Sequence, residues 1–330
     1  MASSTTTTTM RAIVQDRYGS ADVLRHDRIA RPEIGAKEIL VRVHAAGLDR
    51  GTWHLMTGKP YLLRLAMGLR GPRNPVPGRD VAGTVEAVGP EVTKFAVGDE
   101  VYGVAPGSFA EYAVAREDKL ARKPANLTFE QAAVVPISAL TAQDAVAVGR
   151  VGPGQKVLIA GASGGVGSYA VQLAKALGAE VTGMASTAKL DLVLALGADH
   201  VIDYTREDFA ATPDRFDVII DIAGNPSLSR LRRALTATGT AVVTGGEEGG
   251  SLTGGMNRQL GFLVVSLFVR QRLTMVINKE SGSNLERLTE LIEAGTVVPT
   301  LDRTYPLDQA PDAMRHLDAG NVRGKVAITI

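Results

Sequence analysis

The alternation of apolar and polar residues divides the chain into two parts with different periods. From residue 10 to about residue 122, short strand-like runs are separated by glycine and proline. We expect strands at 10–15, 38–46, 82–88, 99–103 and 110–114. Short strands at this spacing are typical of a barrel-like β domain.

From about residue 126 the pattern changes to alternating strands and helices, which predicts a parallel sheet in an α/β domain. We expect strands at 156–160, 180–185, 201–203, 217–221, 240–244 and 273–277, and helices at 166–177, 227–237 and 283–293, the last capped by Ser283. The final stretch, with a helix at 307–318 and a strand at 325–330, does not continue this alternation. We therefore expect it to return to the first domain.

A glycine-rich loop joins the first strand of the α/β part to its first helix. The loop and helix start contain Gly161, Ser163, Gly164, Gly165 and Val166. Glycines at such a turn let the backbone approach a pyrophosphate, and the free N–H groups of the helix N-terminus face the anion. The arrangement of strand, glycine loop, helix and second strand predicts a dinucleotide-binding half of a Rossmann fold. The alternative is a glycine-rich turn that binds no ligand.

The end of the second strand indicates which dinucleotide is bound. An NAD site places Asp or Glu there to bind the ribose 2′-hydroxyl. Here the strand leads into Ser186 and Lys189, and the first carboxylate is Asp191, on the next predicted helix. A hydroxyl and a cation suit a 2′-phosphate, so NADP(H) is favoured over NAD(H). Lys189 could instead be a solvated residue of the first helical turn.

Composition limits the classes of function. The chain has 330 residues, 45% of them hydrophobic, and a net charge of +1 without a basic block, so we expect no nucleic-acid partner. It has no cysteine, which excludes disulfides and thiolate chemistry and fits a cytoplasmic protein. No apolar run reaches the roughly 18 residues of a membrane span. Residues 1–9 are expected to form a disordered tail without the features of a signal peptide.

Eight ordered motifs carry a resemblance to a known family. They are VRVHAAGLD (41–49), PGRDVAGTVEAVG (77–89), VGDEVYG (97–103), GSFAEYAV (107–114), AAVVPISALTAQDAV (132–146), GASGGVG (161–167), DVIIDIAG (217–224) and RGKVAI (323–328). Together they resemble the medium-chain dehydrogenase/reductase superfamily, in its zinc-free quinone oxidoreductase branch. The resemblance implies a GroES-like β-barrel catalytic domain at 10–125, completed by 296–330. It also implies a Rossmann NADP-binding domain with a doubly wound parallel sheet at 126–295, and an active site in the cleft between the two.

Departures from the zinc-dependent members of that family concern the metal site. Those members place Cys, Gly-His-Glu, and Cys or His where this chain has Asp49, Gly78-Arg79-Asp80 and about Ile137. A catalytic zinc needs three protein ligands besides water, and arginine and isoleucine supply none. We therefore expect no metal site.

Without a Lewis acid, a conjugated acceptor is easier to reduce than a simple carbonyl, because the negative charge spreads over an enolate. We expect NADPH-dependent reduction of a quinone or an α,β-unsaturated carbonyl. Asp49 is a candidate catalytic residue, although it could instead pair with Arg79. Tyr61 and His54 are candidate proton donors, or else pocket-wall residues. Rival functions are an enoyl-thioester or enal reductase and a non-catalytic NADP-binding protein.

The resemblance also implies positions for further cofactor-binding residues. Thr141 is expected at the nicotinamide end, and Tyr204 near the adenosine phosphate unless it only caps a strand. Gly245 and Gly246 are expected to let the cofactor pass closely. Phe268 and Lys325 are expected on the nicotinamide side.

Two apolar segments, 53–67 and 261–268, fall where the fold would place the rim of the cleft. They could enclose a small hydrophobic carbonyl or quinone substrate. The alternative is a subunit contact in a homodimer, with the edge strand at 273–277 pairing with its twin.

Overall fold

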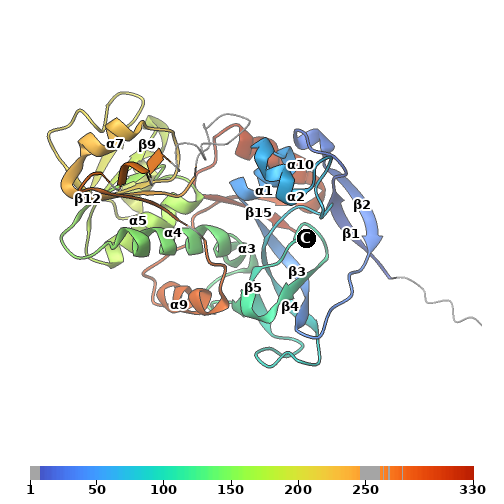
Figure 1. Ribbon diagram of the computed structural model, residues 1–330. Coiled ribbons are helices and arrows are strands. Elements are labelled where there is room, and N and C mark those ends of the chain that lie inside the picture. The colour runs from blue at the N-terminus through green and yellow to red at the C-terminus, as the bar shows by residue number, and fades with distance from the viewer. Residues whose placement is uncertain (1–7, 246–260, 263, 267, 277) are drawn as a thin grey trace, which may run out of the picture.

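The computed structural model describes residues 8–245, 261–262, 264–266, 268–276 and 278–330. Figure 1 shows two lobes, one built from the middle of the chain and one from its two ends. Residue 246, one of the expected cofactor glycines, lies outside the described residues, as does the predicted tail up to residue 7.

The lobe built from the chain ends contains a seven-stranded sheet. Its order is β14 (Leu301–Pro306), β15 (Lys325–Thr329), β3 (Glu38–Leu48), β4 (Asp80–Val88), β5 (Glu100–Val104) and β7 (Leu120–Arg122), and β6 (Tyr112–Arg116) pairs with β3. All pairs are antiparallel except β14 with β15. The strands β1 (Thr9–Val14) and β2 (Arg25–Ala30) form a separate two-stranded sheet.

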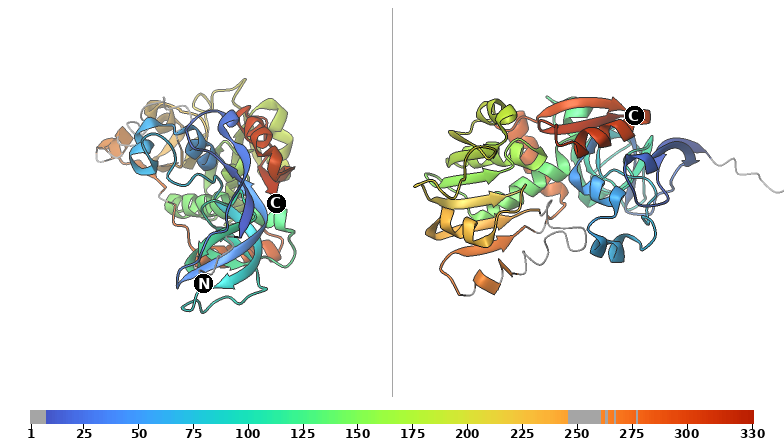
Figure 2. Two further views of the ribbon diagram at one scale, coloured as in Figure 1. Left: turned by 90° about the vertical axis from the view of Figure 1, so that its right-hand side faces the viewer. Right: turned by 90° about the horizontal axis from the view of Figure 1, so that it is seen from above.

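The last stretch of the chain joins this first lobe. Strand β15 pairs with β3, with Val326 opposite Leu48, and Figure 2 shows the red C-terminal strand among the strands of that lobe. The lobe also holds the helices α1 (Arg50–Thr57), α2 (Arg64–Met67), α3 (Phe129–Ala133) and α10 (Ala310–Asp318), and the 3₁₀ turns η1 (Ala21–Val23), η2 (Tyr61–Leu63), η3 (Glu117–Lys119) and η5 (Leu307–Gln309).

The other lobe is a parallel sheet covered by helices. The strand order is β10 (His200–Asp203), β9 (Glu180–Ala185), β8 (Lys156–Ala160), β11 (Phe216–Asp221), β12 (Leu235–Val243) and β13 (Arg272–Met275). Its helices are α4 (Pro136–Gly149), α5 (Gly165–Ala176), α6 (Leu190–Ala195), α7 (Leu228–Ala234) and α9 (Gly282–Glu293), with the 3₁₀ turn η4 (Thr187–Lys189). Within the described residues, β10 and β13 are the two edges of the sheet.

Strand β8 lies in the middle of this sheet and is apolar on both faces. Val157 and Ile159 belong to the apolar cluster that packs against α4, α5 and α9, whereas Leu158 and Ala160 belong to the cluster that includes Leu231 of α7. A strand covered by helices on both faces needs a continuous apolar run, as the sequence has here. The predicted fold class, α/β with a doubly wound sheet and a second β-rich domain, is confirmed.

Element boundaries differ from the sequence predictions at several points. The helix predicted at 227–237 ends at Ala234, because Leu235 already pairs with Phe216 as the start of β12. Ser283 lies inside α9, whose N-cap is Ser281. The prediction also missed β2, β7 and α1, since their mixed polarity follows neither the period of a strand nor that of a helix clearly.

Helix α9 connects the two lobes. The hydroxyl of Tyr102 in β5 donates to the backbone oxygen of Leu285 at 2.8 Å, and the Lys94 ammonium lies 2.7 Å from the Glu286 carboxylate. Asn126 also donates to the backbone of Ile292 at 2.9 Å. These contacts hold α9 of the α/β lobe against the barrel lobe. None of the helices in the described ranges is long and apolar enough to cross a membrane.

Candidate active site

The glycine loop lies at the carboxyl end of β8, at the N-terminus of α5. Gly161 has a φ of +84°, a conformation that favours glycine, and a Cβ on Gly167 would lie 2.0 Å from the Gly161 carbonyl oxygen. Both glycines are therefore required by the fold itself. Gly164, the N-cap of α5, differs from them, because an added Cβ would meet nothing nearer than the Gly161 oxygen at 3.5 Å.

The open space at Gly164 fits a phosphate. The first N–H groups of α5 have no partner within the helix, and the positive end of the helix dipole faces the same space. A Cβ at Gly164 would narrow this space without disturbing internal packing. The residues present thus fit the pyrophosphate of a dinucleotide.

The loop is tied to the C-terminal segment of the chain. The backbone N–H of Gly324 donates to the carbonyl oxygen of Ser163 at 2.8 Å. A Cβ on Gly165 would lie 2.8 Å from the Lys325 side chain and 3.1 Å from the hydroxyl of Ser138. Lys325, which belongs to the barrel strand β15, therefore lies at the N-terminal end of α5.

The residues predicted to bind a 2′-phosphate lie at the ends of β9 and β10. Ser186 precedes η4, and Tyr204 directly follows β10 with 58% of its surface exposed. Lys189 donates to the backbone oxygens of Gly320 and Val322, at 2.7 and 2.8 Å. Burial lowers the pKa of Lys189. Because both partners are neutral carbonyls, the charge of Lys189 is not cancelled by them.

Asp203 is a residue near this position that sequence reasoning did not assign to the site. Its carboxylate accepts hydrogen bonds from the hydroxyls of Thr187 and Thr205, and these bonds lower its pKa. Arg206 lies 3.6 Å away with its side chain 72% exposed. Asp203 is the last residue of β10. Its position beside the end of β9 follows from the pairing of these two strands, which the sequence alone does not show.

Asp49 does not pair with Arg79, so that alternative from the sequence is wrong. Asp49 is the N-cap of α1, and its Oδ1 accepts from the backbone N–H of Thr52 at 2.7 Å and from its hydroxyl at 3.1 Å. Arg79 pairs instead with Glu280, from the segment between β13 and α9. A free helix N-terminus offers a short carboxylate its nearest donors, so Asp49 is bound locally.

The ion pair that forms beside these residues joins Asp80 of β4 and Lys325 of β15. The Nζ of Lys325 lies 3.1 Å from the Asp80 Oδ2, and both side chains are buried, at 2% and 0% exposure. The other Asp80 oxygen accepts from the backbone N–H of Ile137 at 2.9 Å. Burial raises the pKa of Asp80 to about 6, against the lowering effect of Lys325 and together with the negative charge of Asp49.

Thr141 lies on α4, one turn after Ile137. Its hydroxyl donates to the backbone oxygen of Ile137 at 2.7 Å and accepts from the side chain of Asn278 at 2.8 Å. The structure thus links Thr141, Lys325 and the glycine loop through contacts: Lys325 lies beside Gly165 and binds Asp80, which binds the Ile137 backbone one turn before Thr141. Asn278 was missed from the sequence, because the contact spans 137 positions.

The predicted proton donors His54 and Tyr61 lie in the short segment that covers α1, η2 and α2. His54 Nδ1 is 2.7 Å from the Lys59 carbonyl oxygen, and Tyr61 is 43% exposed beneath the guanidinium of Arg64. Each side chain is therefore engaged within this segment. On the Rossmann side, Gly245 follows β12 and Phe268 is 82% exposed.

The three positions compared with zinc ligands carry other interactions. Asp49 caps a helix, Arg79 binds Glu280, and Ile137 contributes only its backbone. Across the part of the chain that the structure describes, no group of three or more His, Cys, Asp or Glu side chains could hold a metal ion.

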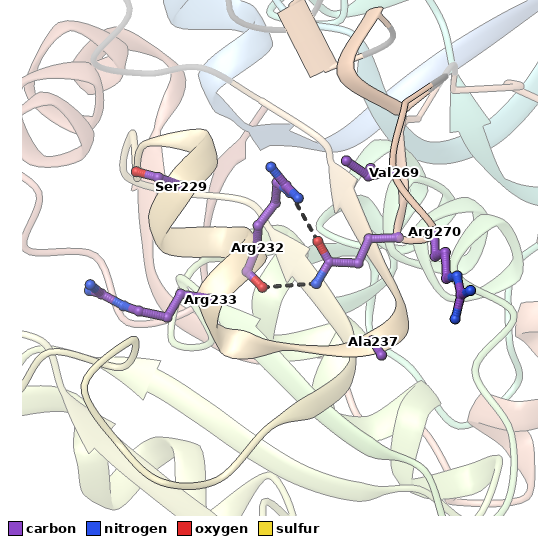
Figure 3. A pocket seen from close by; sticks show the side chains of 7 residues that line it. Ser229, Arg232, Arg233, Ala237, Val269 and Arg270 are labelled. Atoms are coloured by element: carbon purple, nitrogen blue, oxygen red, sulfur yellow. Dashed lines mark hydrogen bonds between the residues drawn. The ribbon is translucent and has the colours of Figure 1, made fainter.

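A surface hollow of about 450 Å³ lies away from this cleft, between α7 and the start of β13. It is lined by Ser229, Arg232, Arg233, Ala237, Val269, Arg270 and Gln271. Figure 3 shows the side chains of Arg233 and Arg270 pointing to opposite sides, while Arg232 exchanges two hydrogen bonds with Gln271. Three guanidinium groups that diverge do not form an anion site.

Comparisons with known proteins agree with this arrangement. Residues 35–125 match the family model of the alcohol dehydrogenase GroES-like domain, and residues 196–328 match that of a zinc-binding dehydrogenase. The chain is 35% identical to 2-methylene-furan-3-one reductase of Solanum lycopersicum, covering 97% of this chain and 79% of that protein. It is 33% identical to the chloroplastic NADPH-dependent alkenal/one oxidoreductase of Arabidopsis thaliana, with coverages of 97% and 79%.

A solved structure is similar over the whole chain. The quinone oxidoreductase from Coxiella burnetii matches with a TM-score of 0.86 and 29% sequence identity, covering 98% of this chain and all of that one. The similarity therefore includes both lobes and the segment that returns from the C-terminus.

Proposed function

Since the chain belongs to the quinone oxidoreductase-like branch of the medium-chain dehydrogenase/reductase superfamily, we propose that it reduces a small hydrophobic quinone or α,β-unsaturated carbonyl with NADPH and without a metal ion. The observation that carries this proposal is the glycine loop at the N-terminus of α5, where an added Cβ at Gly164 would meet nothing nearer than 3.5 Å and the Lys325 side chain lies beside Gly165. Relatives named as alkenal/one and furanone reductases, and a neighbour named as a quinone oxidoreductase, support the acceptor class.

NADPH, when bound, supplies a hydride to the conjugated system of the acceptor. The chain's own residues bind and orient the cofactor. The N-terminus of α5, with Ser163, Gly164, Gly165 and Val166, would hold the pyrophosphate, and Gly245 and Gly246 would let the cofactor pass. Ser186, Lys189 and Tyr204 would select the 2′-phosphate, whereas Thr141, Lys325 and Phe268 would serve the nicotinamide end. Orientation of this kind supplies most of the catalysis that a metal-free site offers.

Reduction also needs one proton, which goes to the α-carbon of an α,β-unsaturated carbonyl or to an oxygen of a quinone. Asp49 is the acid–base candidate that this geometry favours, because its Oδ2 is buried without a hydrogen-bond partner among the described residues. Thr52 holds the Oδ1 of Asp49, so Oδ2 is the oxygen left to face an acceptor. His54 and Tyr61 remain the alternative donors, and solvent would restore the proton.

The segment 53–67 exposes Leu62 and Leu65, at 42% and 67%, which suits the rim of a site for an apolar substrate. We propose a homodimer that forms through the free edge of β13, and a cytoplasmic location.

The test is a steady-state assay of NADPH consumption against 1,4-quinones, 2-alkenals, enoyl thioesters and matched saturated carbonyls. The proposal predicts turnover of quinones or enals and none of the saturated compounds. Turnover restricted to thioesters would support the enoyl-thioester reductase instead. Tight NADPH binding with background turnover of every acceptor would support a non-catalytic NADP-binding protein.

A further inference from the structure

Six residues form a closed ring of contacts around the cleft, which we call the cleft ring: Arg79, Asp80, Ile137, Thr141, Asn278 and Glu280. The Asp80 carboxylate accepts from the backbone of Ile137, whose carbonyl accepts from Thr141. Thr141 in turn accepts from Asn278, two positions before Glu280. Glu280 pairs with Arg79, the neighbour of Asp80, and so closes the ring.

The ring holds the segment 278–280 from both lobes. On the barrel side, Arg79 binds the Glu280 carboxylate and the Lys119 ammonium donates to the Glu280 backbone oxygen at 2.6 Å. On the Rossmann side, the backbone N–H of Lys279 donates to Asp144 of α4 at 2.9 Å. Contacts from both lobes therefore hold the two residues that follow Asn278.

The two hydrogen bonds of the Thr141 hydroxyl determine which atom of the Asn278 amide faces Thr141. The Thr141 hydroxyl has a single hydrogen, which it donates to the Ile137 carbonyl at 2.7 Å. The group facing Thr141 from Asn278 must then be the donor, so Nδ2 points to Thr141 and Oδ1 points away. This Oδ1 is buried and has no hydrogen-bond partner among the described residues.

A buried acceptor without a partner costs about 1–3 kcal/mol, so such an atom indicates a missing donor. The missing donor belongs at the nicotinamide end. Gly165, at the phosphate-binding end of α5, faces Ser138, and Thr141 is one turn further along α4, roughly 4.5 Å along the axis. The nicotinamide ring carries a primary carboxamide whose NH₂ is a neutral donor.

We propose that Asn278 Oδ1 accepts a hydrogen bond from the carboxamide NH₂ of the NADPH nicotinamide, and that the Arg79–Glu280 pair is a positioning device for Asn278. Arg79 thereby takes a role that involves no metal: it holds the segment that orients the cofactor. The inference rests on the NADP(H) binding described above, but not on which acceptor is reduced.

The test compares equilibrium binding of NADPH with that of its reduced 3-acetylpyridine analogue, which replaces the carboxamide NH₂ by a methyl group. We expect the unmodified protein to bind NADPH about 3- to 10-fold more tightly than the analogue, as one neutral hydrogen bond provides. Asn278→Ala should weaken NADPH binding to the level of the analogue and leave binding of the analogue nearly unchanged. Loss of affinity for both compounds by the same factor would overturn the inference, as would unchanged affinity for NADPH.

Variants of the ion pair test the positioning role. Glu280→Gln and Arg79→Met should each reduce the preference for NADPH over the analogue at least 2-fold while the apo protein stays folded, as judged by thermal unfolding. Glu286→Gln is the matched control, because it removes the Lys94–Glu286 pair, which also joins α9 to the barrel but lies outside the ring. A preference that survives loss of the Arg79–Glu280 pair would contradict the positioning role. If the unmodified protein bound neither compound, the cofactor assignment itself would fail, which is a separate result.

Discussion

The Lys325 ammonium and the Asp80 carboxylate are 3.1 Å apart inside the protein, although the two residues are separated by 245 positions in the chain. Each side chain is almost fully buried, with 2% and 0% exposure. Neither charge would be tolerated there alone, because a buried charge without a partner destabilises the fold by several kcal/mol. The C-terminal strand therefore supplies the cation that compensates the buried charge of Asp80.

Lys325→Met should destabilise the protein in a pH-dependent way. The folded-state pKa of Asp80, about 6, is above its ordinary value of 3.8, so the carboxyl contributes stability at low pH that is lost as the pH rises through 6. Without Lys325 the pKa rises further. We expect a loss of about 3–5 kcal/mol at pH 8 and a smaller loss at pH 5.5, measured by urea unfolding.

The double variant Asp80→Asn/Lys325→Met is the control for this experiment. The Asn oxygen can still accept from the Ile137 N–H, and no ionisable group is left at the site. The difference between the two pH values should therefore disappear. Equal destabilisation of Lys325→Met at both pH values would show that Asp80 does not titrate as described.

Asp49→Asn is expected to lower the pKa of Asp80 while leaving the fold intact. The Asn side chain retains an oxygen for the Thr52 N–H, so the cap of α1 survives and the free energy of unfolding should change by less than about 1 kcal/mol. Removing the charge of Asp49 removes one cause of the raised pKa of Asp80. The pKa would be followed by the carboxyl carbon shift in NMR, and an unchanged or higher value would contradict the coupling.

Substitutions of two neighbouring glycines should have separable effects. Gly164→Ala places a methyl group in open space, so we expect stability within about 1 kcal/mol and NADPH binding weakened at least 10-fold. Gly167→Ala would bring a Cβ to 2.0 Å from the Gly161 oxygen, which forces the loop and helix apart and destabilises the protein. Titration of NADPH fluorescence and thermal unfolding distinguish them. Normal NADPH affinity in Gly164→Ala would show that the pyrophosphate does not bind at this helix end.

Ser186→Asp should reverse the preference between cofactors. A carboxylate at the end of β9 repels a 2′-phosphate and can accept from a ribose hydroxyl, so NADPH affinity should fall at least about 10-fold while NADH affinity holds or improves.

Lys189→Met separates two roles of that lysine. Weaker binding of NADPH alone would indicate phosphate contact, whereas equal weakening of both cofactors would indicate that its bonds to Gly320 and Val322 matter more.

Removal of metal ions should leave the activity unchanged. The protein after dialysis against EDTA is expected to keep its full rate of quinone or enal reduction, and elemental analysis should find less than stoichiometric zinc. The physical reason is that Arg79 and Ile137 offer no ligand atoms from their side chains. Loss of activity that zinc restores would contradict the metal-free proposal.

The sequence alone determined the elements whose signal is local. The strand, glycine loop and helix at 156–177 follow from neighbouring residues, because apolar runs, glycine conformations and helix periodicity act over a few positions. The sequence also showed that Arg79 and Ile137 stand at positions where zinc-dependent members have metal ligands, because each residue type can be judged by itself. The sequence prediction was wrong where a residue fits the pattern of two elements. Leu235 fits the helical pattern of α7, but in the structure it pairs with Phe216 as part of β12.

Only the tertiary structure decided which charged side chains meet. Arg79 had a plausible partner in Asp49, yet the helix N-terminus of α1 takes Asp49 and the segment before α9 supplies Glu280, 201 positions from Arg79. A Coulomb attraction depends on distance in space and on burial, and neither is encoded in residue spacing when the partners belong to different lobes. The sequence thus determined the strand, glycine loop and helix, whereas tertiary packing determined that Lys325 meets Asp80 and that Glu280 meets Arg79.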